Sequence, residues 1–238
     1  LAQYLPADTF AYIGIRTDQA YLETINAVIS QVAAATGEDV PEGGALGMFA
    51  EQIETATEGQ FTYESGIRAW LGNSAAIAVV NFPQLMTNPN AALFLVEVKD
   101  PQPLRELLAS RFINFEDDAT IEEGDGFTYY KNESSFSTSL LLTDTMFYAG
   151  PSTVIDSVIA NRSADTLATS PNFIAAYDAL PADTYNLFGY LDGAALVKTL
   201  SAFSDPDNLA FPIDFEKLEA AVNVQSFGGT IFEDRTFA

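Results

Sequence analysis

The spacing of apolar residues along the chain alternates between the periods of strands and of helices. Strands buried on both faces are predicted where apolar residues follow one another without a polar face, at 10–16, 75–80 and 91–98. Further strands are predicted at 185–191 and 224–232. Helices are predicted where apolar residues return every three or four positions, at 18–37, 46–53, 67–72, 100–112, 151–159, 170–177, 192–203 and 215–222.

Three aspartates stand immediately before predicted helices, and we expect them to start those helices. Asp18 and Asp192 each follow a predicted strand, and Asp100 is followed by Pro101 at the first helical position. A carboxylate at the N-cap accepts hydrogen bonds from backbone N–H groups that the first turn leaves free. These residues therefore predict where each helix begins.

The pattern changes to a period of two in the middle of the chain. Residues 127–130, 136–142 and 146–148 alternate in this way and are separated by short polar turns, which predicts an antiparallel meander. The acidic segment 116–125 before them is predicted to be a turn or loop.

A five-residue sequence occurs twice and organises these elements. Leu5-Pro6-Ala7-Asp8-Thr9 returns as 180–184, and each copy precedes a strand, an Asp and a helix. We predict an α+β protein of mixed or antiparallel sheets with packed helices, made of a complete module at 1–179 and the start of a repeated module at 180–238. Asp8 and Asp183 are expected to stabilise equivalent turns, so that replacing either with Ala would cost about 0.5–2 kcal/mol.

Composition excludes several classes of function. Apolar residues make up 48% of the 238 positions, so the chain can form a core, but 33 acidic against 10 basic residues give a formal charge of −23. Nucleic acids and acidic membrane surfaces are therefore not expected as partners. The chain has no Cys and no His, which excludes disulfides, Ser-His-Asp and Cys-His catalysis and most zinc sites.

Several short motifs resemble an exported bacterial family described as domain of unknown function 3352. They are the two Leu-Pro-Ala-Asp-Thr copies and the segments 70–73, 97–101 and 170–173. The resemblance implies tandem modules outside the cytoplasm, an N-terminal segment that holds the full-length protein at a membrane, and no assigned catalytic residues. No apolar run in this sequence reaches the ~18 residues of a membrane span, and we expect a leader to have been removed before Leu1.

One polar cluster predicts a metal site. Asp205, Asp207, Asn208 and Asp214 supply oxygen ligands of the kind that Ca²⁺ binds. The simpler interpretation, which we favour, is a solvated loop that caps the helix predicted at 215–222. A second acidic segment, 116–125, could hold a cation or bind a basic partner protein, but we favour a charged, hairpin-like loop.

Two further kinds of site are open to a chain without His. A pair of facing carboxylates could catalyse hydrolysis, but 33 acids leave the pair unspecified. Trp70 and the 18 Phe residues could line a pocket for an apolar ligand, although periodicity places them in the core. We therefore predict a non-catalytic, extracytoplasmic domain of the bacterial envelope with a structural or protein-binding role. Binding of a small apolar ligand or divalent cation is the alternative, and a carboxylate hydrolase is the third.

Overall fold

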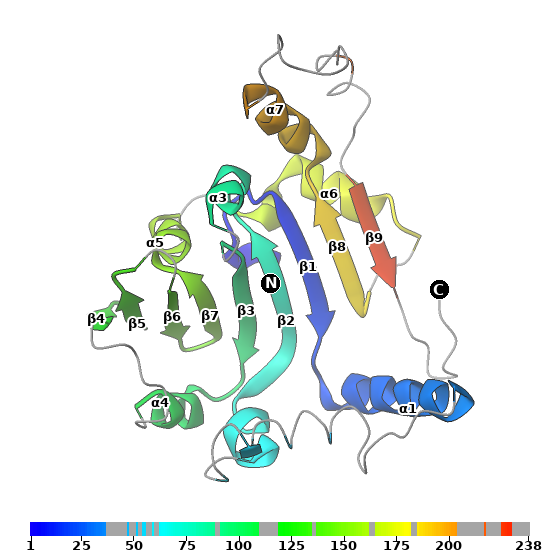
Figure 1. The fold of residues 1–238 in the computed structure, drawn as a ribbon, viewed down its shortest axis with the longest axis vertical. Coiled ribbons are helices and arrows are strands. Elements are labelled where there is room, and N and C mark those ends of the chain that lie inside the picture. Colours follow the sequence, from blue (N-terminus) through cyan, green and yellow to red (C-terminus); the bar gives the residue numbers. More distant parts are fainter. Residues whose placement is uncertain are drawn as a thin grey trace.

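The computed structural model contains one nine-stranded sheet with helices around it (Figure 1). It describes residues 1–36, 47, 51, 54–55, 59, 62–88, 91–109, 119–134, 137–161, 165–181, 185–203, 217 and 225–229. The strand order is β4-β5-β6-β7-β3-β2-β1-β8-β9, and every neighbouring pair is antiparallel. The α+β fold class with an antiparallel sheet is thereby confirmed.

The strands are short, and most of them coincide with predicted segments. They are β1 (Ala11–Arg16), β2 (Leu71–Val79), β3 (Leu93–Val98), β4 (Ala119–Gly124), β5 (Phe127–Asn132), β6 (Thr138–Thr143), β7 (Met146–Pro151), β8 (Leu187–Leu191) and β9 (Gln225–Gly229). The predicted meander is confirmed as β5, β6 and β7.

The helices lie on both sides of the sheet and at its ends. They are α1 (Gln19–Thr36), α3 (Phe82–Thr87), α4 (Pro101–Ala109), α5 (Ser152–Ala160), α6 (Pro171–Asp178) and α7 (Gly193–Phe203), with the short turns η1 (Ala2–Tyr4), η2 (Tyr63–Arg68, a π-helix) and η3 (Leu167–Thr169).

The three predicted helix starts are confirmed by hydrogen bonds. The carboxylate of Asp18 accepts from the backbone N–H of Tyr21 at 3.1 Å, and that of Asp192 from Ala195 at 2.9 Å. At α4, Asp100 accepts from the N–H of Gln102 at 3.0 Å. Each bond satisfies a donor that the first helical turn cannot pair internally.

The main core lies on one side of the sheet, which we call the closed face. Side chains of alternate strand residues point to it and meet η1, η3, α5 and α6. The buried members from the strands are Tyr12, Ala76, Ala78, Leu93, Leu95, Tyr129, Leu141, Met146, Tyr148, Phe188 and Tyr190. Leu5 and Leu167 bury the two short turns against them. The side chains at the intervening strand positions therefore point to the opposite side of the sheet.

Two predictions about local structure are wrong. The acidic segment expected as a loop contains β4, an edge strand whose residues from Thr120 onward are all exposed. Charged residues on an edge strand hinder pairing with other chains, so this acidity is compatible with a strand. The helix expected at 67–72 is instead η2, which ends at Arg68, and Leu71 already belongs to β2.

The turn before β1 is closed by a different residue from the one predicted. Asp8 is exposed, and its carboxylate makes no hydrogen bond within the described part of the chain. Thr9 is 1% exposed, and its hydroxyl and backbone N–H both donate to the carbonyl of Pro6, at 2.7 and 3.1 Å. Asp183 lies outside the described residues.

The predicted second module joins the same sheet as the first. Strand β8 pairs with β1 along Ala11–Ile15, and β9 pairs with β8. The structure shows one continuous sheet across position 180, and the internal repeat itself remains a prediction.

Candidate functional site

A single row of apolar residues crosses the sheet on the side opposite the closed face. Its members are directly paired in register from one strand to the next: Ile121, Tyr130, Leu140, Ala149, Phe94, Ile77, Ile13, Gly189 and Phe227, on β4, β5, β6, β7, β3, β2, β1, β8 and β9. Since paired residues of neighbouring strands share a face, the row is continuous across all nine strands.

Helix α4 packs against the part of this row that lies on β5, β6 and β7, whereas Ile121 on β4 is 65% exposed. Leu104 and Leu108, one helical turn apart on the same face of α4, are buried in a cluster with side chains of four neighbouring strands. The cluster's strand residues include Tyr130, Leu140, Leu142 and Val98, with Phe147 packed against it. Trp70, just after η2, completes the cluster. This half is an ordinary second core.

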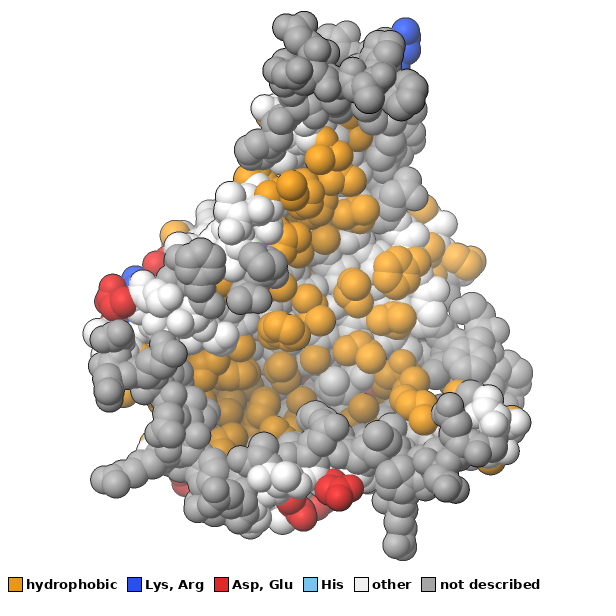
Figure 2. Space-filling model, in the orientation of Figure 1, with side chains coloured by type: hydrophobic (Ala, Val, Ile, Leu, Met, Phe, Trp, Pro, Cys, Tyr) orange, Lys and Arg blue, Asp and Glu red, His pale blue; other side chains and the backbone are white. Residues whose placement is uncertain are grey.

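The other half of the row is exposed. On β3, β2, β1 and β9, Phe94 is 51% exposed, Ile77 43%, Ile13 45% and Phe227 51%, and Ile15 beside them is 40% exposed. These five residues are called the open half below. Figure 2 shows apolar side chains gathered over these strands. Taking ~200 Å² for a fully exposed large apolar side chain, the five present roughly 450 Å² of surface.

Charged residues are missing from this side of the five strands β3, β2, β1, β8 and β9. From Ala75 to Val79 on β2, and along β1, β3, β8 and β9, the positions that share the face of the row are Ala11, Ile13, Ile15, Ala75, Ile77, Val79, Phe94, Val96, Val98, Leu187, Gly189, Leu191, Gln225, Phe227 and Gly229. None of them is acidic or basic, although the chain carries 43 charged residues in 238, 33 acidic and 10 basic.

Gly189 makes the row continuous between β1 and β9. A Cβ atom built on Gly189 would lie 2.1 Å from the ring of Phe227, so the aromatic ring occupies the space that any other residue's side chain would fill. The ring therefore lies over the backbone of β8. An aromatic side chain on a neighbouring strand often covers a glycine in this way.

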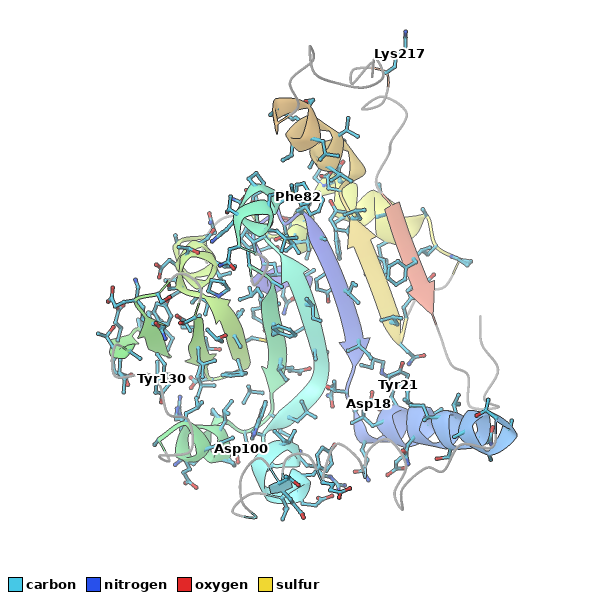
Figure 3. The ribbon with its side chains drawn as sticks, in the orientation of Figure 1. Asp18, Tyr21, Phe82, Asp100, Tyr130 and Lys217 are labelled. Atoms are coloured by element: carbon cyan, nitrogen blue, oxygen red, sulfur yellow. The ribbon has the colours of Figure 1, made fainter. Side chains whose placement is uncertain are left out.

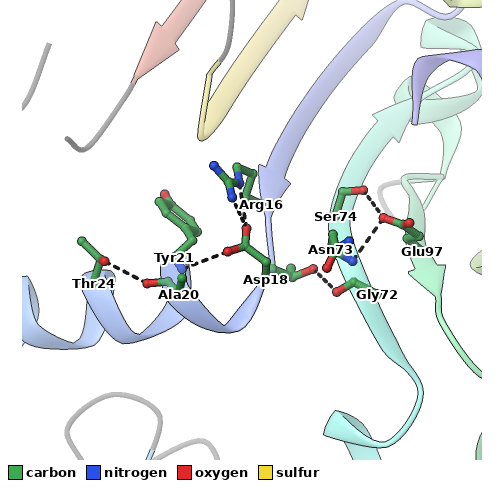
Figure 4. Close-up of polar contacts among 10 residues, drawn as sticks. Arg16, Asp18, Ala20, Tyr21, Thr24, Gly72, Asn73, Ser74 and Glu97 are labelled. Carbon is green, nitrogen blue, oxygen red and sulfur yellow. Dashed lines mark hydrogen bonds and ion pairs between the residues drawn. The ribbon is translucent and has the colours of Figure 1, made fainter. Parts of the chain in front are cut away.

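Polar contacts hold the strand ends beside the open half (Figure 4). The hydroxyl of Thr17 donates to the carbonyl of Gly72 at 2.8 Å, which joins the end of β1 to β2. One carboxylate oxygen of Glu97 on β3 accepts from the backbone N–H of Asn73 at 3.1 Å and from the hydroxyl of Ser74 at 2.8 Å. In Figure 3, Asp18 and Asp100 lie at this same end of the sheet, where α1 and α4 begin.

A cleft of about 470 Å³ with polar and apolar lining residues lies next to these contacts, between α1 and η2. Arg68 donates to both carboxylate oxygens of Glu64, at 2.6 and 2.8 Å, and to Gln19, which in turn donates to Glu23 at 2.7 Å. The hydrogen bond that Arg68 donates to Glu64 is the main cause that raises the pKa of Arg68. Arg68, Glu64, Gln19 and Glu23 thus form one chain of hydrogen bonds along the cleft.

The predicted metal ligands Asp205, Asp207, Asn208 and Asp214 lie outside the described residues. Among the residues that are described, no group of three or more potential ligands is close enough to hold a metal ion. Of the second acidic segment, Glu122, Glu123 and Asp125 are described, and all three are exposed. The Ca²⁺ site therefore remains a prediction.

The expectation that the aromatic residues belong to the core is right for Trp70 and wrong for two phenylalanines. Trp70 is buried and its ring N–H donates to the carbonyl of Gly66, whereas Phe94 and Phe227 are half-exposed. Sequence reasoning missed the open half because an uninterrupted apolar strand is typical of burial on both faces. Only the absence of polar residues on the side of β1 and β3 opposite the closed face could have indicated the open half.

Comparisons with known proteins give little further information. No family model and no curated protein matches the sequence. Two crystal forms of TP0453, forms III and I, resemble the structure with TM-scores of 0.42 and 0.41 and 12% identity, and each match covers 98% of this chain and 74% of the other. Within the described residues no helix is long and apolar enough to cross a membrane.

Proposed function

We propose that this protein is a non-catalytic binding domain that takes an apolar surface of another protein on its open half. The observation that carries the proposal is the register row: Phe94, Ile77, Ile13 and Phe227 form one exposed apolar line across five strands, with no charge beside it. Exposed apolar surface of a few hundred Å² is typical of interaction sites in soluble proteins.

The energy available at this surface is large enough for binding. At about 25 cal/mol per Å², burying roughly 450 Å² contributes about 11 kcal/mol before the costs of association. An uncharged row of Ile and Phe provides packing and desolvation and offers no group for acid–base chemistry. These properties support a binding role over the carboxylate hydrolase.

We further propose that the partner is another protein of the bacterial cell envelope. Three features support this: the chain lacks Cys, carries a strong negative charge, and has motifs that resemble an exported family. We also propose that the full-length protein is exported and held at a membrane.

The test uses a neutral fluorescent dye, Nile red, whose emission increases in apolar surroundings. We expect the wild-type protein to enhance its fluorescence and the double variant Ile77→Thr/Phe94→Thr to lose most of that enhancement. Thr retains a high β-propensity, and far-UV circular dichroism verifies that the variant is folded.

The matched control is Ile121→Thr/Ile174→Thr. These two side chains are 65% and 43% exposed, but they lie at the far edge of the sheet and on α6. The control should enhance Nile red as the wild type does. Equal loss in both double variants, or no enhancement by the wild type, would show that the open half is not an apolar binding surface.

A further inference from the structure

We infer that the segment bound by the open half is an amphipathic α-helix of the partner, with a basic polar side. This inference rests on the proposed function and specifies its partner. Three observations lead to it: the way α4 covers the neighbouring half of the row, the dimensions of the exposed half, and the distribution of charge.

The covered half of the row shows how a helix fits this face. Helix α4 places Leu104 and Leu108 on side chains of β5, β6 and β3, so it lies across several strands, and Figure 1 shows it at the end of the sheet beside the open half. Phe94 is the register partner of Ala149, which packs against the α4 cluster. A helix on the open half would therefore lie on the same side of the sheet as α4.

The exposed half has the length of a short helix. From β3 to β9 the row crosses four gaps between strands, or ~19 Å at ~4.8 Å each. A helix of ~13 residues has the same length, and its turns repeat every 5.4 Å. One apolar side chain per turn would thus meet successive strands. A helix in an apolar groove is a common mode of recognition.

A second copy of the chain fits less well. The exposed apolar surface, roughly 450 Å², is about half of the ~800 Å² that each partner buries in a stable interface. Each copy would also bring a formal charge of −23, and the two would repel each other. A single helix needs no larger surface.

Charge indicates the sign of the helix's polar side. Arg16, Arg68, Arg105 and Lys131 each form an ion pair with an acidic side chain, at 2.6–3.1 Å. Since the chain has 33 acidic and only 10 basic residues, most acids cannot have such a partner. A helix with Lys or Arg on its polar side would be attracted to this protein, and an acidic helix would be repelled.

The experiment compares three synthetic 15-residue peptides. The first has Leu at positions i, i+4, i+7 and i+11 and Lys on its polar side, the second has the same Leu stripe with Glu in place of Lys, and the third is the first with its order scrambled. We expect isothermal titration calorimetry to show at least about tenfold tighter binding of the first than of the other two. Affinity should weaken several-fold between 50 and 500 mM NaCl.

Variants locate the binding. Ile77→Thr/Phe94→Thr and, separately, Ile13→Thr should each weaken binding of the Lys-sided peptide about tenfold, whereas Ile121→Thr/Ile174→Thr should stay within twofold of the wild type. Equal binding of the peptide by all variants would mean unspecific attraction to an acidic protein and would overturn the inference.

Other outcomes separate this inference from the proposed function. If Nile red binds the open half but the Lys-sided peptide does not, the helix is wrong and the binding surface stands. Dimerisation in analytical ultracentrifugation that Ile77→Thr/Phe94→Thr abolishes would assign the surface to a second copy. Binding to phosphatidylcholine vesicles lost in the same variant would assign it to lipid. Either result overturns the inference.

Discussion

Thr9 holds the turn that leads into the centre of the sheet. It is almost fully buried, and its side chain and backbone both donate to Pro6. The following residue, Phe10, stacks on Phe82 with ring centroids 4.5 Å apart and donates from its backbone N–H to Val79. The conspicuous acid of the sequence motif, Asp8, is turned to solvent. The side-chain group that stabilises this turn is therefore the hydroxyl of Thr9 and not the carboxylate of Asp8.

This arrangement predicts a clear loss of stability for one of two neighbouring substitutions and little change for the other. Thr9→Val keeps the shape but removes a buried hydrogen bond, and should lower the free energy of unfolding by about 1 kcal/mol. Asp8→Ala should change it by less than about 0.5 kcal/mol, as is usual for exposed positions. Urea denaturation of both variants measures the difference. A larger loss in Asp8→Ala would restore the aspartate as the turn-forming residue.

At the scale of elements, cap residues were the most reliable signal. Asp18, Asp100 and Asp192 were identified from the sequence alone and each accepts a hydrogen bond in the first turn of its helix. Helix α3 was missed, although Asn81 caps it by accepting from Gln84 at 3.2 Å and Pro83 follows. Its six residues are too few to show a helical period. The sequence pattern there is therefore interpreted as the end of the preceding strand and a turn.

The caps can be tested as a pair. Asp18→Ala and Asp192→Ala should each lower the free energy of unfolding by about 1 kcal/mol, because a helix N–H group loses its acceptor. Chemical denaturation followed by circular dichroism measures both. Glu106→Ala, an exposed acid in the middle of α4, is the control for lost charge and should have little effect. An equal decrease in all three variants would attribute the loss to charge and not to capping.

At the scale of the whole molecule, the closed face holds tyrosines whose ionisation is unfavourable in the folded state. Tyr12 is buried beside Phe173 and Phe188, with ring centroids 5.9 and 6.3 Å away. Burial raises the pKa of Tyr12 to about 12. The pKa of Tyr190 is also raised, by burial and by the nearby Asp192.

These raised pKa values predict that the folded protein loses stability as the pH rises into the alkaline range. The folded protein holds the Tyr12 proton more tightly than the unfolded chain, so this contribution is complete below pH ~10 and is lost as the pH rises toward about 12. Over that range the wild type should lose about 2–3 kcal/mol more stability than Tyr12→Phe. Urea denaturation of both proteins from pH 8 to 12 measures it. Parallel pH profiles would contradict the assignment.

The sequence by itself determined the local part of this fold. Strand and helix periods, caps and the meander depend on residues a few positions apart, so they can be identified without knowing the partners of each segment. Composition likewise restricted the chemistry, since a chain without Cys and His lacks the commonest nucleophile–base pairs.

Only the tertiary structure decided which apolar residues remain exposed. Ile77 and Phe94 lie in segments as apolar as a buried strand, and nothing near them in sequence distinguishes them from Leu93 and Leu95, which are fully buried. The difference arises when β3 is placed beside β2 and β7. Leu93 and Leu95 then point into the core of the closed face, whereas Ile77 and Phe94 point to the other side and do not belong to the α4 cluster. The exposure of these residues therefore depends on how the sheet is assembled. The proposed binding surface depends on it in the same way.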